Sequence, residues 1–108
     1  MRTLTAFLCL TFAVLLFSAG EAFALPPCPE DQNQRYHNCF GTYAYTIGDK
    51  YVGEWKNGII HGQGIFTSYA GRKYIGQWKD GNPWHGNVYD ENGVVVAFYL
   101  EGVRTENQ

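Results

Sequence analysis

The residues of this chain that could do chemistry are two histidines at matching places, a pair of cysteines and scattered carboxylates. His61 and His85 each stand directly before a glycine, and paired histidines invite a metal site. If each lies in its own hairpin, equivalent positions are two strand spacings apart, or about 10 Å, whereas both nitrogens must lie within about 2.1 Å of a zinc ion. We therefore expect neither a metal nor a cofactor, and we interpret both histidines as polar residues beside turns.

The candidates for catalysis are weak as well. Ser68 is the one serine after residue 24, and it lacks the G-x-S-x-G turn that exposes a nucleophile. A pair of carboxylates could hydrolyse glycosides, but the acidic residues occupy alternating or turn positions that exposure to solvent explains. These residues are Glu54, Asp80, Asp90 and Glu91. We predict that the chain is not an enzyme.

The cysteines predict a structural role. The chain has three, and Cys9 lies in a leader that we expect to be removed. Cys28 and Cys39 are eleven positions apart, which fits neither the C-x-x-C redox motif nor a zinc half-site. An even number of cysteines in an oxidising compartment favours a disulfide, and closing this loop is worth about 3 kcal/mol. We predict a disulfide-tied N-terminal segment over residues 25–38.

The first 24 residues have the pattern of an export signal. A run without charged residues spans 3–20 behind Arg2, and Ala22-Phe23-Ala24 is the pattern of small residues that export peptidases cut after. We predict a signal peptide over residues 1–24, cleavage after Ala24 and an exported product, periplasmic or secreted. The alternative is an uncleaved membrane anchor, since the uncharged run approaches the length that spans a bilayer.

Composition restricts the remaining classes of function. Aromatic residues make up 17% of the chain and charged residues also 17%, with 13 glycines, which is unlike a disordered chain. The net charge of -2 lacks the basic surplus that nucleic-acid binding needs. We expect a packed, single-domain fold with no nucleic-acid partner.

An internal repeat supplies the elements that position these residues. A shift of 23 residues places 51–58 on 74–81. Within each unit tyrosine, glycine and tryptophan alternate with other residues, as on one face of a strand, and Asn57-Gly58 and Asp80-Gly81 favour tight hairpin turns. Glycines facing aromatic residues predict rings that lie on bare backbone. The repeat glycines are Gly53, Gly58, Gly62, Gly64, Gly76 and Gly81.

The pattern Tyr-x-Gly-x-Trp-x-x-Gly, followed by His-Gly-x-Gly-x-Phe, resembles the MORN (membrane occupation and recognition nexus) repeat over 51–73 and 74–81. The segment from Leu25 to Tyr43 also looks like the start of small exported bacterial MORN-repeat proteins. The resemblance implies an all-β fold, a single-layer twisted array of antiparallel β-hairpins over residues 39–102. It implies association with a membrane or a protein, and no particular chemistry.

The C-terminal unit departs from the repeat. Its loop after Gly81 is one residue longer, Pro83 cannot donate a hydrogen bond to a sheet, and Val88 stands where the repeat has Gly64. We expect this unit to be a cap that does not stack in the standard way. A strand over 94–99 closes it, and a frayed tail follows over 103–108.

The aromatic face is the predicted binding surface, because a one-layer sheet cannot hide all of its rings and an exposed apolar groove marks a binding site. We expect the groove to hold a protein, a peptide or an envelope surface. The residues chosen for it are Tyr51, Trp55, Phe66, Tyr74, Trp78 and Trp84. One alternative is that the rings only stabilise the sheet.

A second alternative is weak binding to anionic phospholipid membranes. Lysines recur at equivalent places of the repeat, although acidic residues are interleaved with them. They are Lys50, Lys56, Lys73 and Lys79. An open array also has edge strands at both ends, which leaves the oligomeric state open.

Overall fold

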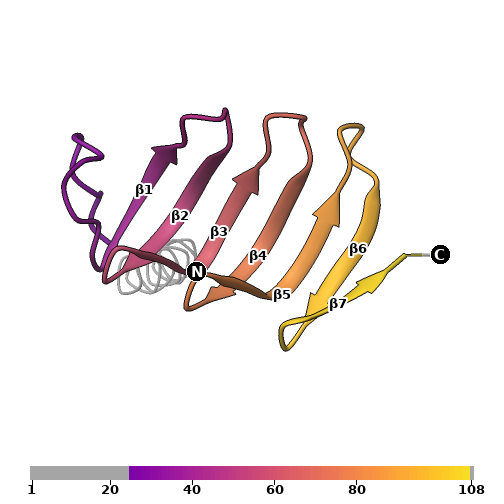
Figure 1. Cartoon of the computed structure of the whole chain (residues 1–108). Helices are drawn as coiled ribbons and strands as arrows, with labels where there is room; N and C mark the ends of the chain where they lie inside the picture. The colour runs from indigo at the N-terminus through magenta and orange to yellow at the C-terminus, as the bar shows by residue number, and fades with distance from the viewer. Residues whose placement is uncertain (1–24, 108) are drawn as a thin grey trace, which may run out of the picture.

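The computed structural model describes residues 25–107, so the expected signal peptide over 1–24 lies outside the described residues. The chain forms one seven-stranded sheet in which each strand pairs antiparallel with its neighbours in sequence (Figure 1). The strands are β1 (Cys39–Ala44), β2 (Lys50–Lys56), β3 (Ile59–Thr67), β4 (Lys73–Lys79), β5 (Asn82–Tyr89), β6 (Val95–Leu100) and β7 (Val103–Glu106). The predicted all-β, single-layer array is confirmed. Residues 25–107 contain no helix that could cross a membrane.

Tight two-residue turns join β2 to β3, β4 to β5 and β6 to β7. In each turn both central residues have positive φ, as type I′ hairpins require: 54° and 75° at Asn57-Gly58, and 49° and 86° at Asp80-Gly81. The third turn, Glu101-Gly102, has φ angles of 50° and 81°. It returns the chain into β7, where we expected a frayed tail. The tail prediction is corrected for 103–106, since the turn aligns β7 with β6 and Asn107 N–H donates to the Val96 carbonyl at 2.8 Å.

The opposite ends of the strands carry wider loops. In each of these three loops the N–H of the first residue donates to the carbonyl of the last, at 2.8–2.9 Å. The pairs are Tyr45 and Asp49, Ser68 and Arg72, and Asp90 and Val94. The residue before the last one is a glycine with φ between 83° and 98° in every case, namely Gly48, Gly71 and Gly93. The two ends of the sheet therefore have different turn geometry, repeated along the array.

Bulges bend the hairpins. The strand register shifts between Gly53 and Trp55 and again between Gln77 and Trp78. A bulge bends a strand and increases its twist. The lower ends of the hairpins accordingly turn away from the strand direction, and the sheet is curved rather than flat (Figure 1).

The core is a single row of rings on one face. Neighbouring rings in it contact edge to face, with centroids 4.9–5.5 Å apart and planes at 80–90°. In spatial order they are Tyr36, Trp55, Tyr51, Trp78, Tyr74 and Tyr99. Each such pair adds about 0.5–1.5 kcal/mol beyond the area it buries, so this aromatic ladder replaces the second layer that a small domain usually needs.

Glycine pairs provide the room for the ladder. Gly53 lies opposite Gly64, and a Cβ atom at Gly64 would be 2.0 Å from the hydroxyl oxygen of Tyr51. That hydroxyl donates to the Glu54 carbonyl at 3.1 Å. The ring therefore lies across bare backbone, as the sequence predicts.

The third unit stacks in the standard way after all. Gly86, not Val88, lies opposite Gly76, and Val88 pairs with Tyr74 just as Phe66 pairs with Tyr51. The reason is the size of the bulge. In β3 the three residues 61–63 lie opposite Glu54 alone, so the bulge has two extra residues, whereas β5 has one extra residue, Trp84. Each later residue of β5 is therefore displaced by one position relative to its counterpart in β3. The expectation of an irregular cap is corrected.

The N-terminal segment covers the outer edge of β1. Cys28 N–H donates to the Phe40 carbonyl at 2.9 Å, and Phe40 N–H donates to the Pro26 carbonyl at 2.8 Å. The predicted disulfide between Cys28 and Cys39 is confirmed. It fixes this segment against the first strand.

Candidate functional site

Four of the six rings predicted to form the binding groove are core residues. Tyr51 is fully buried, and Trp55, Tyr74 and Trp78 are 6%, 6% and 8% exposed. Their neighbours enclose most of the surface of these four rings, so the predicted exposure of the rings is corrected. The cause is packing between repeats: the ring of Tyr51 lies 5.5 Å from that of Trp78 in the next unit. Phe66 and Trp84 remain partly exposed.

The exposed part of this face is a cleft of about 190 Å³ beside the ladder, which we call the ring-side cleft. Phe66, Val88 and Tyr99 give it an apolar floor, and Arg72, Lys73 and Arg104 stand at its rim. The full lining is Phe66, Ser68, Arg72, Lys73, Tyr74, Trp78, Pro83, Val88, Tyr99 and Arg104. An apolar floor below several cations suits a ligand that carries an apolar group next to an anionic one.

The rim cations differ in their surroundings. Arg104 pairs with Glu106, two residues along β7, and the hydrogen bond to Glu106 followed by one to Tyr99 raises the pKa of its guanidinium. The same hydrogen bond lowers the pKa of the exposed Glu106 carboxyl. Within residues 25–107, Arg72 and Lys73 form no ion pair. These two cations are therefore free to meet an anionic group of a ligand.

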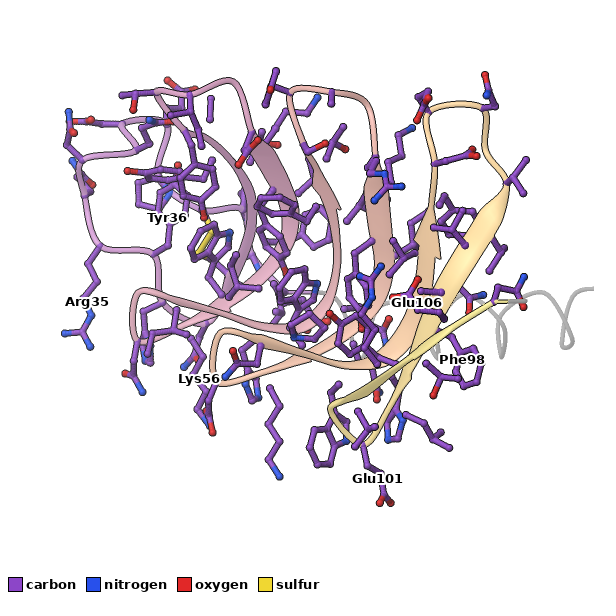
Figure 2. All side chains as sticks on the ribbon, turned by 45° about the vertical axis from the view of Figure 1, so that its right-hand side comes forward. Arg35, Tyr36, Lys56, Phe98, Glu101 and Glu106 are labelled. Atoms are coloured by element: carbon purple, nitrogen blue, oxygen red, sulfur yellow. A yellow bond between two sulfur atoms is a disulfide. The ribbon has the colours of Figure 1, made fainter. Side chains whose placement is uncertain are left out.

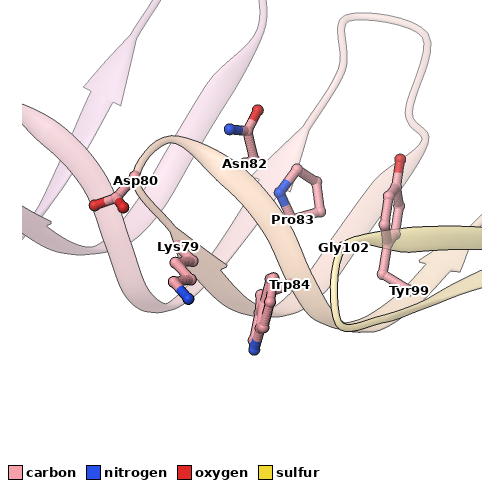
Figure 3. A pocket seen from close by; sticks show the side chains of 7 residues that line it. All are labelled: Lys79, Asp80, Asn82, Pro83, Trp84, Tyr99 and Gly102. Atoms are coloured by element: carbon pink, nitrogen blue, oxygen red, sulfur yellow. The ribbon is translucent and has the colours of Figure 1, made fainter.

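A second, larger cleft of about 530 Å³ surrounds Trp84 (Figure 3). The ammonium of Lys79 lies 4.3 Å from the centroid of the Trp84 ring, a cation–π contact. A Cβ atom at Gly102 would lie 3.4 Å from the same ring, and the Trp84 carbonyl accepts the Gly102 N–H at 3.0 Å. Trp84 thus supports the turn into β7 as well as lining a surface, so it has a structural role that the sequence did not reveal.

The opposite face of the sheet carries an exposed apolar row that sequence reasoning missed. Val52, Ile65 and Ile75 lie side by side on consecutive strands, and Ile65 and Ile75 are 39% and 40% exposed. Phe40 borders this row at one end. Phe98, labelled in Figure 2, lies on the same face beyond the other end, since Asn87 of β5 pairs with both Ile75 and Phe98. The sequence did contain a signal for this row. Its residues alternate with the core residues along the strands, and on a solvated face such positions normally carry polar residues.

The three histidines have a shared structural role. His37 Nδ1 accepts a hydrogen bond from the backbone N–H of Asn57 at 2.9 Å. His61 and His85 accept in the same way from Asp80 and Glu101, at 3.4 and 3.3 Å. Each donor is the first positive-φ residue of the tight turn of the next hairpin. The histidines therefore link one repeat to the next, a role that needs a neighbouring repeat to be seen.

The geometry defines a class: an open array of bent hairpins whose core is a row of alternating tyrosines and tryptophans over glycine pairs. The family model of the MORN repeat matches residues 51–71 and 74–84. Residues 51–84 therefore carry MORN repeats, and the predicted resemblance to this family is confirmed. A search among curated proteins found no match. Repeats of this kind are in general binding modules.

Proposed function

We propose that this protein is a non-enzymatic, exported interaction module that holds a segment of a partner protein in the ring-side cleft. The observation that carries the proposal is the apolar floor of Phe66, Val88 and Tyr99 under the cations Arg72 and Lys73. A peptide segment that carries an apolar side chain next to a carboxylate matches both features.

A non-enzymatic role agrees with the surroundings of Ser68. Its hydroxyl accepts the backbone N–H of Arg72 at 3.2 Å, within its own loop. That contact stabilises the loop and does not activate a nucleophile, which would need an adjacent base. The carboxylate of Glu54 is likewise engaged, since it accepts the Gln63 N–H at 2.6 Å.

The alternative, binding to an anionic membrane, is the weaker hypothesis. The lysines at repeat-equivalent positions belong to strand ends, and Asp80 stands directly beside Lys79. Of the four lysines, Lys73 alone lines the ring-side cleft, together with Arg72 and Arg104. A small concave site matches a side chain better than it matches a flat bilayer.

Selection from a display library of short random peptides tests the proposal. We expect selected peptides to combine an apolar residue with Asp or Glu, and R72E to weaken their binding by about tenfold, the loss of one charged contact. Lys56 is exposed and lies outside the cleft, so K56E is the matched control for the change in charge and should leave affinity within about twofold. Equal losses in the two variants would contradict the proposed site.

Flotation with vesicles of anionic phospholipid tests the alternative. We expect no flotation of the protein at moderate salt. Flotation that disappears at high salt, together with no peptide selection, would show an electrostatic membrane contact in place of a protein partner.

Export rests on the leader and on the disulfide, which suits an oxidising compartment. Intact mass of the protein from its native host, before and after reduction, tests it. We expect a chain that begins at Leu25 and that exposes two thiols only on reduction. A full-length chain with free thiols would place the protein in a reducing or membrane-anchored setting.

A further inference from the structure

The two outer edges of the sheet are unlike each other. The edge of β1 is covered by the backbone of Pro26 to Cys28 and tied by the disulfide. Among residues 25–107, β7 pairs with β6 alone, and all of its residues are exposed. An uncovered edge strand is a template for pairing with another strand.

The backbone of β7 offers its free hydrogen-bonding groups at two residues. Asn107 N–H donates inward to Val96, and the register pairs Thr105 with Phe98. Because hydrogen-bonding groups alternate from side to side along an antiparallel strand, the N–H and C=O groups of Arg104 and Glu106 face outward.

We propose that two copies of this chain pair antiparallel through β7, about a two-fold axis at Thr105. A two-fold axis perpendicular to the sheet leaves each face of the sheet on the same side in both copies. Such an axis lies between the two strands and places one residue opposite the same residue of the second copy, because opposite residues must point to the same face. With the axis at Thr105, Arg104 of each copy lies opposite Glu106 of the other copy. Each of these pairs exchanges two backbone hydrogen bonds.

The neighbouring registers are disfavoured by charge. Centring the axis on Arg104 places two arginines opposite each other, and centring it on Glu106 places two glutamates opposite each other. Like charges directly across a strand pair are destabilising, whereas opposite charges stabilise it. Only the register at Thr105 makes the edge complementary to itself, which is why the occupant is a second copy.

The side chains already have the arrangement that this pairing needs. Arg104 and Glu106 lie on one face and pair within the strand, and their side chains are 38% and 62% exposed. In the dimer each arginine would lie between its own Glu106 and that of the second copy, forming a ring of alternating charge. On the other face the Thr105 side chains of the two copies would contact each other, with a Phe98 side chain from each copy beside them.

Charge variants, followed by native mass spectrometry, test the pairing. We expect the protein to dimerise, and R104E and E106R each to be monomeric because every cross-strand pair is then like-charged. Mixing the two variants should restore a dimer, since one strand then carries two acids and the other two bases. Rescue on mixing separates pairing between chains from the contact within one strand, which mixing cannot restore.

T105C provides a second test that does not depend on charge. The axis places the two Thr105 Cα atoms about 4.5 Å apart, within disulfide reach, so T105C should form a covalent dimer on mild oxidation. V103C should not, because Val103 would lie opposite Asn107 of the second copy. Near-UV circular dichroism of the ladder checks that each variant is folded. A protein that stays monomeric up to about 1 mM, or a dimer that R104E leaves intact, would overturn the proposal.

Discussion

Single atoms decide whether the ladder can form, because the rings lie on backbone that has no side chain. The hydroxyl of Tyr51 lies over the Gly53–Gly64 pair, and that of Tyr74 donates to the Gln77 carbonyl at 2.7 Å. Both hydroxyls are thus bonded to carbonyls inside the bent hairpin. Each tyrosine therefore fills space with its ring and satisfies a carbonyl at the bulge with its hydroxyl.

Replacement of Gly64 by alanine should be among the most destabilising single changes. The added Cβ atom would overlap the Tyr51 ring and hydroxyl, and overpacking of this kind costs about 3 kcal/mol. G93A is the matched control: its φ of 83° costs about 1 kcal/mol, but no atom lies within 4 Å of the new Cβ. Urea unfolding measures both. Equal losses would show that the ring does not rest on Gly64.

The buried tyrosines predict a loss of stability at alkaline pH. Burial is the largest cause that raises the pKa of Tyr51 and of Tyr74 above the ordinary value of 10.0. Above pH 10 the unfolded chain loses these protons while the folded chain keeps them, so the free energy of unfolding falls as pH rises. Below pH 10 both states are protonated and this contribution is constant.

Urea unfolding on either side of pH 10 checks this effect. Y51F should show a shallower alkaline decline, at a cost of about 1 kcal/mol at neutral pH for the lost hydrogen bond to Glu54. An unchanged slope in Y51F would mean that Tyr51 ionises as easily in the folded chain as in the unfolded one.

Each hairpin has two kinds of end, and the links between hairpins lie at the tight turns. The carbonyls of Tyr36, Ile60 and Trp84 accept the N–H of Gly58, Gly81 and Gly102, at 2.7–3.0 Å. The histidine that follows each of these carbonyls caps the same turn. A repeat is therefore completed by the segment before it, and Tyr36 with His37 supplies this contact to the first full hairpin.

Removal of the disulfide should loosen that first contact. The double variant C28S/C39S loses a crosslink worth about 3 kcal/mol, and the segment around Tyr36 loses its anchor to β1. Hydrogen exchange should then quicken at the amides of Asn57 and Gly58 and stay unchanged at Gly81. Uniform acceleration along the array would indicate a global loss of stability instead.

For the molecule as a whole, local signals predicted most of the architecture. The Asn-Gly and Asp-Gly turns, the strand alternation, the disulfide and the rings over glycine follow from residues that are close in sequence. The burial of Trp55 and Trp78 could not be predicted, because it depends on rings from neighbouring repeats. The place of Gly86 could not be predicted either, since the size of a bulge is set by pairing across strands.

The last strand was missed for a related reason. Glu101 adopts a φ of 50°, which glutamate does rarely outside such turns, and its N–H is held by His85 from β5. The ring-side cleft lies on the predicted aromatic face, and its lining includes Phe66, Tyr74 and Trp78 of the six rings chosen from the sequence. Arg72 and Arg104 lie far apart in the sequence, and only the return of β7 brings both to one cleft.

The most direct test of the central claim is to map a selected peptide on the protein by NMR. Binding in the ring-side cleft should shift the side-chain signals of Phe66, Val88 and Tyr99. The methyl signals of Ile65 and Ile75, on the other face of the sheet, should stay in place. Shifts confined to Ile65 and Ile75 would contradict the account and move the binding surface to the opposite face of the sheet.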